Sequence, residues 1–157
     1  MDKTIVTALL VIAGVISAVA LFNALYPMVT QGGEAMGSME RRLSDQLKTQ
    51  VQIIHAAKSG SNTVTVWAKN VGSVRIIGAD TSDLFFGPEG NFERIAYGGS
   101  GAPRWEYTVE NATEWTPTAT IKITITTASV LPASPSGRYF VKLTLPNGVM
   151  HDYFFSW

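Results

Sequence analysis

Residues 5–26 read IVTALLVIAGVISAVALFNALY, and this stretch decides how the chain is organised. No charged side chain occurs anywhere between Thr4 and Gly33. As an α-helix, these 22 residues extend about 33 Å, which matches the hydrocarbon thickness of a lipid bilayer. The sequence therefore predicts a membrane-spanning helix near the N-terminus.

A cleaved secretory signal is the alternative interpretation of this stretch. Such a signal has a shorter apolar region, with basic residues before it and a small-residue cleavage site after it. Here the residues before the run are Asp2 and Lys3, and those at its end are Tyr26 and Pro27. The membrane helix is therefore the preferred interpretation.

Residues 34–57, EAMGSMERRLSDQLKTQVQIIHAA, continue the helix with an amphipathic pattern. Such a helix packs either on the core of the next domain or on copies of itself, and the pattern leaves both open. Pro27, Gly32 and Gly33 predict one long helix that is bent or locally loosened over 27–33. The apolar residues that recur every three or four positions are Met36, Met39, Leu43, Leu47, Val51 and Ile54.

After residues 59–62 the hydrophobic period changes to two, which is typical of β-strands. Pro146-Asn147-Gly148 predicts a hairpin turn, since Asn-Gly adopts the positive φ angles that tight turns need. We therefore expect an α+β protein with an N-terminal helix over 1–58 and an immunoglobulin-like β-sandwich over 59–157. The predicted strands are 63–69, 73–77, 83–86, 92–97, 104–110, 120–127, 138–145 and 149–156.

Charge and composition exclude several functions. The 157 residues include 12 Lys and Arg against 12 Asp and Glu, so the formal net charge is zero and we expect no nucleic-acid partner. The absence of Cys excludes thiolate chemistry, and the two histidines are His55 and His151. No HExxH, GxSxG or phosphate-loop motif occurs. We therefore expect a non-enzymatic protein without a cofactor or a bound metal.

Two groups of residues superficially resemble binding sites. Glycines 98, 99 and 101 are followed by neither Lys nor a predicted helix, so they are interpreted as a surface turn. Asp80, Asp83 and Glu89 provide too few oxygens for calcium, and turn capping by Asp80 and Ser82 is the favoured interpretation.

Asn111 is a candidate glycosylation site, because Asn111-Ala112-Thr113 forms a sequon in a predicted loop. The tryptophans are expected to be core and interface residues rather than a ligand cage. They are Trp67, Trp105, Trp115 and Trp157.

Several stretches, in this order and spacing, resemble the archaellin family, whose members build or anchor the archaeal motility filament, the archaellum. The apolar run of residues 5–26 is similar to the filament-core helix of archaellins and of type IV pilin-like proteins. The sandwich stretches that carry the resemblance are WAKNVGSVRI (67–76), TSDLFFG (81–87), WEYTVE (105–110), WTP (115–117), GRY (137–139) and PNGV (146–149). The WTP and PNG features are also similar to the archaellum stator proteins, which share the sandwich.

The resemblance implies a structural subunit of the archaellum filament that polymerises through its N-terminal helix and serves swimming motility. The implied partners are copies of the chain in a helical homopolymer, the membrane before assembly, and archaellum motor and assembly proteins. The implied location is a cell-surface filament, with a membrane-inserted intermediate. A stator subunit anchored by one helix and a non-rotating adhesive pilin are the alternatives.

The expected polymerisation helix contains both large apolar and small side chains, because close packing of apolar helices needs small residues. Members of the family usually begin with a short charged leader ending in Gly, and none precedes Ile5, so the chain is either essentially mature or processed differently. The residues expected at the helix contacts are Ile5, Val6, Leu9, Leu10, Ile12, Ala13, Gly14, Ile16, Ser17, Ala20, Leu21 and Ala24.

Overall fold

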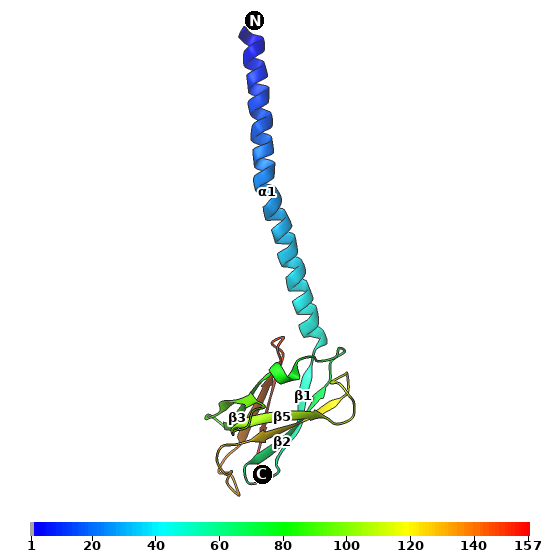
Figure 1. Ribbon diagram of the computed structural model, residues 1–157, viewed down its shortest axis with the longest axis vertical. Coiled ribbons are helices and arrows are strands. Elements are labelled where there is room, and N and C mark those ends of the chain that lie inside the picture. Colours follow the sequence, from blue (N-terminus) through cyan, green and yellow to red (C-terminus); the bar gives the residue numbers. More distant parts are fainter. Residues whose placement is uncertain (1) are drawn as a thin grey trace. The chain divides into compact units, whose positions relative to one another are not determined.

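The computed structural model describes residues 2–157 and confirms the α+β class. A single helix, α1 (Asp2–Lys48), precedes eight strands (Figure 1). The chain divides into two compact units, of which the first ends at Leu43 and the second begins at Ser44. The second unit, called the head below, contains the last turn of α1 and all the strands.

Helix α1 is continuous through Pro27, and residues 27–33 remain helical. Proline has no N–H to donate to the carbonyl four residues earlier, so an interior proline weakens a helix at that turn. The ribbon in Figure 1 changes direction gently in this region. Thr30 Oγ1 donates to the carbonyls of Tyr26 and Pro27, at 3.1 Å each. The prediction of one long helix is thus confirmed, with a bend but without a break.

The predicted continuation of the helix to residue 57 is wrong, because α1 ends at Lys48 and residues Val51–Lys58 form strand β1. Val51 and Ile53 are each 2% exposed and face the core, whereas Ile54 lies at a β-bulge and is 47% exposed. Val51 and Ile54 fit a helical stripe, but the alternation of Val51 and Ile53 fits a strand equally well. Tertiary pairing with β2 decides between them.

The strands form one mostly antiparallel sheet in the order β1-β2-β6-β5-β4-β3-β7-β8, with β4 and β5 as its parallel pair. The sheet curls into a near-barrel sandwich, so its two edge strands, β1 and β8, lie close together. The Ile53 N–H donates to His151 Nδ1 across this gap, at 3.3 Å. The remaining bounds are β2 Thr63–Asn70, η1 Ala79–Thr81, β3 Asp83–Pro88, β4 Glu93–Tyr97, β5 Arg104–Val109, β6 Thr120–Thr126, β7 Tyr139–Thr144 and β8 Met150–Phe155.

The core lies between the inner faces of the curled sheet. The predicted alternation in β6 is confirmed, since Ile121, Ile123 and Ile125 are 0% exposed. Val64 and Val66 of β2 lie opposite Ile125 and Ile123 and are equally buried. The head therefore has a closed hydrophobic core of its own.

The predicted strand at 73–77 is wrong, because this segment is an irregular loop. Its backbone bonds go to separate elements: the Ser73 N–H donates to the Lys48 carbonyl, and the Ile76 N–H to the Trp115 carbonyl. Gly72 permits this crossing, since a Cβ there would collide with the Lys48 carbonyl oxygen. The predicted turn at 146–148 is confirmed, with Gly148 at φ 85°.

Thr118 has an unfavourable backbone conformation, which gives a first prediction. It follows Pro117 in a turn closed by the Ala119 N–H donating to the Thr116 carbonyl, and its φ is 69°. A β-branched residue in this region is strained by about 1–3 kcal/mol. We expect Thr118→Gly to stabilise the protein by about 1 kcal/mol, since glycine fits this position but loses more entropy on folding. Thermal unfolding of the detergent-solubilised full chain measures the gain.

The matched control is Thr116→Gly in the same turn, where φ is not positive. This control should lower the melting temperature. Equal effects of the two substitutions would mean that Thr118 carries no strain.

Candidate functional site

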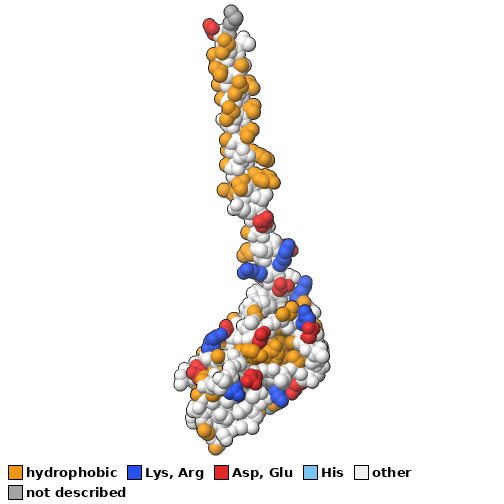
Figure 2. All heavy atoms as spheres, in the orientation of Figure 1, with side chains coloured by type: hydrophobic (Ala, Val, Ile, Leu, Met, Phe, Trp, Pro, Cys, Tyr) orange, Lys and Arg blue, Asp and Glu red, His pale blue; other side chains and the backbone are white. Residues whose placement is uncertain are grey.

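The first candidate site is the surface of α1 itself, on which no described residue is buried. Large apolar side chains in the uncharged part are more than half exposed, for example Leu10 at 68% and Phe22 at 66%. Among residues 2–157, α1 is the helix long and apolar enough to cross a membrane. Figure 2 shows apolar side chains along most of the helix, with an acidic group at its N-terminal end and most of its charged groups in its second half.

Two hydroxyl side chains within the apolar stretch bond to the backbone of the helix. Thr7 Oγ1 donates to the Lys3 carbonyl and Ser17 Oγ to the Ala13 carbonyl, both at 2.8 Å. A helix satisfies its backbone groups internally, and these hydroxyl groups are satisfied as well. These two hydroxyl groups can therefore leave water for lipid or for an apolar protein environment without losing their partners.

The residues predicted at polymerisation contacts, from Ile5 to Ala24, all lie on this exposed surface. A Cβ added at Gly14 would meet nothing within 4 Å, so this glycine leaves an open position on the helix. The structure holds a single copy of the chain, and the contacts between copies therefore stay a prediction.

The second candidate site is the start of the head, where the chain passes from α1 into β1. The Lys48 carbonyl accepts the Ser73 N–H at 2.9 Å, and the Gln50 carbonyl accepts the N–H groups of Val71 and Gly72 at 2.9 and 3.1 Å. Gln46 Nε2 adds a bond to the Asn147 carbonyl, at 2.7 Å. Two loops of the head therefore hold the residues that connect helix to sheet.

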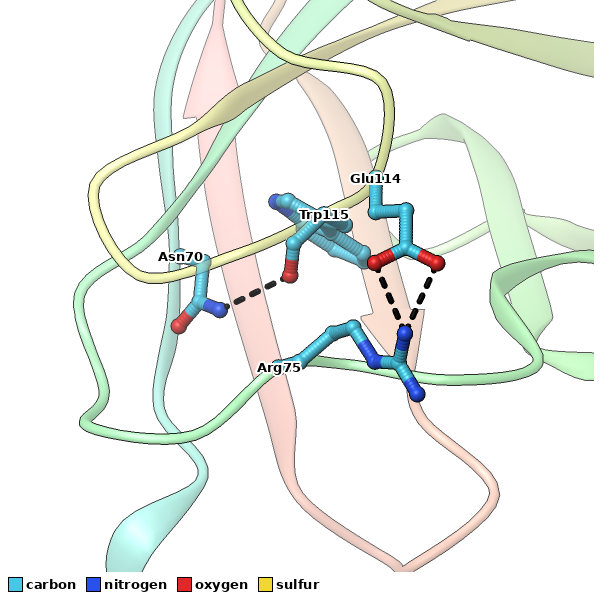
Figure 3. Close-up of polar contacts among 4 residues, drawn as sticks. All are labelled: Asn70, Arg75, Glu114 and Trp115. Atoms are coloured by element: carbon cyan, nitrogen blue, oxygen red, sulfur yellow. Dashed lines mark hydrogen bonds and ion pairs between the residues drawn. The ribbon is translucent and has the colours of Figure 1, made fainter.

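Asn70, at the end of β2, fixes the loop that makes these bonds. Its side chain is 0% exposed. Its Nδ2 donates to the Trp115 carbonyl at 3.1 Å (Figure 3) and to the Val74 carbonyl at 2.9 Å. Its Oδ1 accepts the Gly72 N–H at 3.0 Å. Sequence reasoning missed this role, although a buried Asn at the end of a strand next to Val-Gly is a typical loop anchor.

An exposed ion pair lies beside this anchor. Arg75 Nη1 is 2.7 Å from both carboxylate oxygens of Glu114 (Figure 3), and the two side chains are 47% and 54% exposed. Exposed pairs of this kind contribute at most about 1 kcal/mol, because water and salt screen them.

The acidic residues considered for a cation do not form a site. Asp83 pairs with Arg94 at 2.6 Å, and Glu89 pairs with Arg138 at 2.9 Å. Asp80 is exposed on η1, and the turn bond there is made by Thr81 Oγ1 to the Gly78 carbonyl at 2.8 Å, rather than by Asp80. Among residues 2–157, no three His, Asp or Glu side chains lie close enough together to hold a metal.

Tyr107 is the titratable group whose pKa is shifted. Partial burial raises the pKa of Tyr107, and the nearby Tyr97 and Asp80 raise it further. Its phenol therefore stays neutral at physiological pH and behaves as a packing side chain. Trp105, which lies against it, is completely buried, as predicted for a core tryptophan.

The remaining sequence candidates lie apart from one another. The His55 ring packs on Trp67 with 5.5 Å between ring centroids, whereas His151 bonds to Ile53. Gly98 and Gly99 have positive φ in a loop, as expected of a surface turn. Asn111 is exposed and its Oδ1 accepts the Thr120 N–H at 3.0 Å. Its glycosylation stays a prediction.

Replacing Asn70 should be far more damaging than replacing the nearby Arg75. Asn70→Ala would remove three hydrogen bonds of a completely buried side chain, so we expect a loss of about 3 kcal/mol. The Val74 carbonyl would lose its partner, whereas the Gly72 N–H and the Trp115 carbonyl keep their bonds to Gln50 and Ile76. Arg75→Ala, the matched control, should cost at most about 1 kcal/mol. Denaturant unfolding of the full chain in detergent measures both losses, and similar losses would contradict the role given to Asn70.

Comparison with known proteins identifies relatives of the whole chain. A family model described as archaeal-type flagellin matches residues 3–154. An uncharacterised protein of Archaeoglobus fulgidus is 27% identical over 164 residues, which cover 99% of this chain and 98% of that protein.

The solved structures that resemble the chain include two that match about two thirds of it and one that matches nearly all of it. The archaellum periplasmic stator protein FlaG of Sulfolobus acidocaldarius is 31% identical with a TM-score of 0.61, over 68% of this chain and 99% of that one. The complex of FlaF and FlaG from that organism gives 33% identity and a TM-score of 0.60, over 68% and 89%. The archaeal flagellum of Methanospirillum hungatei is 16% identical with a TM-score of 0.55, over 94% and 89%, which is a likeness of fold alone.

Proposed function

The chain belongs to the archaeal-type flagellin family, whose members are structural components of the archaellum, and we propose that it is a membrane-anchored stator subunit. One observation carries this choice: 31% of the aligned residues are identical to the FlaG stator protein over nearly the whole of that protein. The filament protein is covered over 89% of its length but is 16% identical. This higher identity to one stator protein than to one filament protein supports the proposal.

In this role, α1 and the head would have different tasks, namely anchoring and partner binding. The uncharged part of α1 spans the membrane once and anchors the protein, because its apolar surface is exposed and a helix satisfies its own backbone groups. The head lies outside the membrane and needs no help from α1 to bury its core. A stator must stay fixed while the filament turns, and the head supplies the surface for its static partners.

The proposed partners follow from the relatives. FlaG of Sulfolobus acidocaldarius is found in a complex with FlaF, so we propose a FlaF-like protein as the first partner of this head. Archaellum motor and assembly proteins are further partners on the membrane side.

A filament subunit is the second candidate function. The match to the Methanospirillum filament covers 94% of this chain, which includes the helix, whereas the match to FlaG covers 68%. In this alternative α1 would leave the membrane and pack with other copies in a filament core.

Fractionation of cells separates the two functions. Filaments are sheared from the surface, and the filament and membrane fractions are compared by quantitative mass spectrometry. The stator proposal expects this chain in the membrane fraction and, at most, in trace amounts in filaments. If it is the dominant protein of the filaments, the stator proposal is wrong and the filament subunit replaces it.

A charge placed in the middle of the apolar stretch should prevent anchoring. Lysine at the centre of a membrane helix costs about 2.5–3.5 kcal/mol on insertion scales. We therefore expect Gly14→Lys to lower the equilibrium constant for insertion roughly a hundredfold and so to lower the membrane-inserted fraction. Carbonate extraction of membranes measures that fraction.

Gly33→Lys is the matched control for this substitution. Gly33 also has nothing within 4 Å of an added Cβ, but it adjoins Glu34 at the end of the uncharged stretch. Lysine there can reach water, so insertion should be unchanged. If Gly14→Lys and Gly33→Lys stay in the carbonate-extracted membranes to the same extent, residues 5–26 are not the membrane span.

A further inference from the structure

Strand β5 has one edge that the sheet pairs only in part. On one side it pairs with β6 over its whole length, from Arg104 to Val109. On the other side β4 pairs with Arg104 and Trp105, and this parallel contact ends there. From Glu106 to Val109, this side of β5 has no neighbouring strand in the described sheet, and we call it the free edge.

The hydrogen bonds at the two ends of β5 show which backbone groups point toward the free edge. The Glu110 N–H donates to β6 at 3.0 Å, whereas the Trp105 carbonyl accepts the Gly98 N–H at 2.9 Å on the other side. Because successive residues of a strand turn their groups to opposite sides, Tyr107 and Val109 direct their N–H and carbonyl groups away from β6. Within residues 2–157, these groups have no backbone partner.

An apolar groove of about 250 Å³ lies beside the free edge. It is lined by Tyr107 and Val109 of β5 and by the loop that contains Ile77, which is 71% exposed. The ion pair of Arg75 and Glu114 also lines it, and these two charges offset each other. In Figure 2, apolar side chains gather on the head in this region, between η1 and β5 of Figure 1. A strand added at the free edge would place every second side chain in this groove.

The charges around the free edge are mostly acidic. Glu106 and Glu110 are exposed and lie on the face of β5 opposite to Tyr107. Asp80 is the acidic group close to Tyr107 on the groove side. Glu106 pairs with Arg104 at 3.1 Å, whereas no ion pair of the described residues includes Glu110 or Asp80. The surroundings of the edge therefore favour a positively charged partner.

We propose that the free edge accepts an extended segment of a partner protein in which apolar residues alternate with Lys or Arg. An extended chain presents N–H and carbonyl groups to Tyr107 and Val109, whereas a helix has used its own. The apolar residues enter the groove, and the basic residues lie beside Glu106 and Glu110 on the other face. The inference rests on the proposed function, since it gives the head of a stator a surface for a static partner.

A second copy of this chain fits the free edge poorly. If two β5 edges pair antiparallel through their free groups, Tyr107 of one copy lies opposite Val109 of the other. The same register places Glu106 opposite Glu110 at both ends of the contact. Like charges directly opposite each other destabilise a sheet, so a different, basic partner is favoured.

Amide hydrogen exchange of the full chain in detergent, followed by NMR, tests the free edge without any substitution. In the protein alone, the N–H groups of Tyr107 and Val109 should exchange much faster than that of Thr108, which faces β6. The end-blocked peptide KVKIKVK should slow exchange at Tyr107 and Val109 at least about tenfold and leave Thr108 unchanged. The peptide EVEIEVE is the matched control and should protect neither group.

Two substitutions separate the contribution of the edge from that of the charges. Val109→Pro removes an outward N–H but no bond to β6, so the head should stay folded while its affinity for KVKIKVK falls at least about tenfold. Glu110→Lys should lower this affinity about fivefold. Glu34→Lys changes the net charge equally but lies on α1, so it should leave the affinity unchanged. Thermal unfolding of each variant checks that the head is folded.

Several results would overturn the proposal. One is slow exchange at Tyr107 and Val109 in the protein alone, which would mean that the edge is already covered. Others are unchanged exchange with KVKIKVK at about 1 mM, where even weak binding is visible, and equal protection by EVEIEVE. A folded Val109→Pro variant that binds KVKIKVK normally also contradicts it. None of these results bears on the stator function, which is judged by recovery of the chain with membranes or with filaments.

Discussion

The long apolar helix cannot remain alone in water, and the rest of the structure depends on this constraint. None of its described residues is buried, and its large apolar side chains are mostly exposed. A helix is one of the few structures that can enter lipid, because it pairs its own backbone groups. The helix therefore requires a membrane or other helices, and the head must be stable without using the helix as part of its core.

The family resemblance leaves the choice between anchor and polymer subunit open for a physical reason. Both roles need an apolar helix followed by a β-sandwich, so the fold alone does not decide between them. What differs is the helix surface that other chains contact and the partner that the head meets. The identity of 31% to the FlaG stator protein covers 68% of the chain, whereas the likeness to the filament covers 94% of it but is a likeness of fold alone.

Strong periodic patterns made most of the fold predictable. The uncharged stretch predicted α1, and the alternation in residues 120–127 predicted the buried face of β6. Residues 51–57 were predicted as helix because their apolar spacing fits both periods, and pairing with β2 is a long-range effect that local patterns do not contain. Residues 73–77 alternate like a strand, but the close crossing at Gly72 directs their backbone bonds to other elements.

The candidate sites were predictable to different degrees. Composition alone identified the apolar helix, because its chemistry depends on many similar residues in a row. The anchoring role of Asn70 and the bond from Ile53 to His151 depend on residues far apart in the sequence. Single polar residues of this kind carry no periodic signal, so the three-dimensional structure was needed to find them.

The bonds around Lys48 and Gln50 have a mechanical consequence. Any force that an anchored helix transmits to the head enters through two residues and then through β1, which is an edge strand with a paired neighbour on one side. Edge strands are the easiest part of a sheet to peel away under tension. The Lys48 and Gln50 carbonyls are held by the loop at 71–73, which Asn70 in turn locks to the interior. Tension arriving through the helix would therefore act on this loop and on β2, which ends at Asn70, as well as on the β1 ladder.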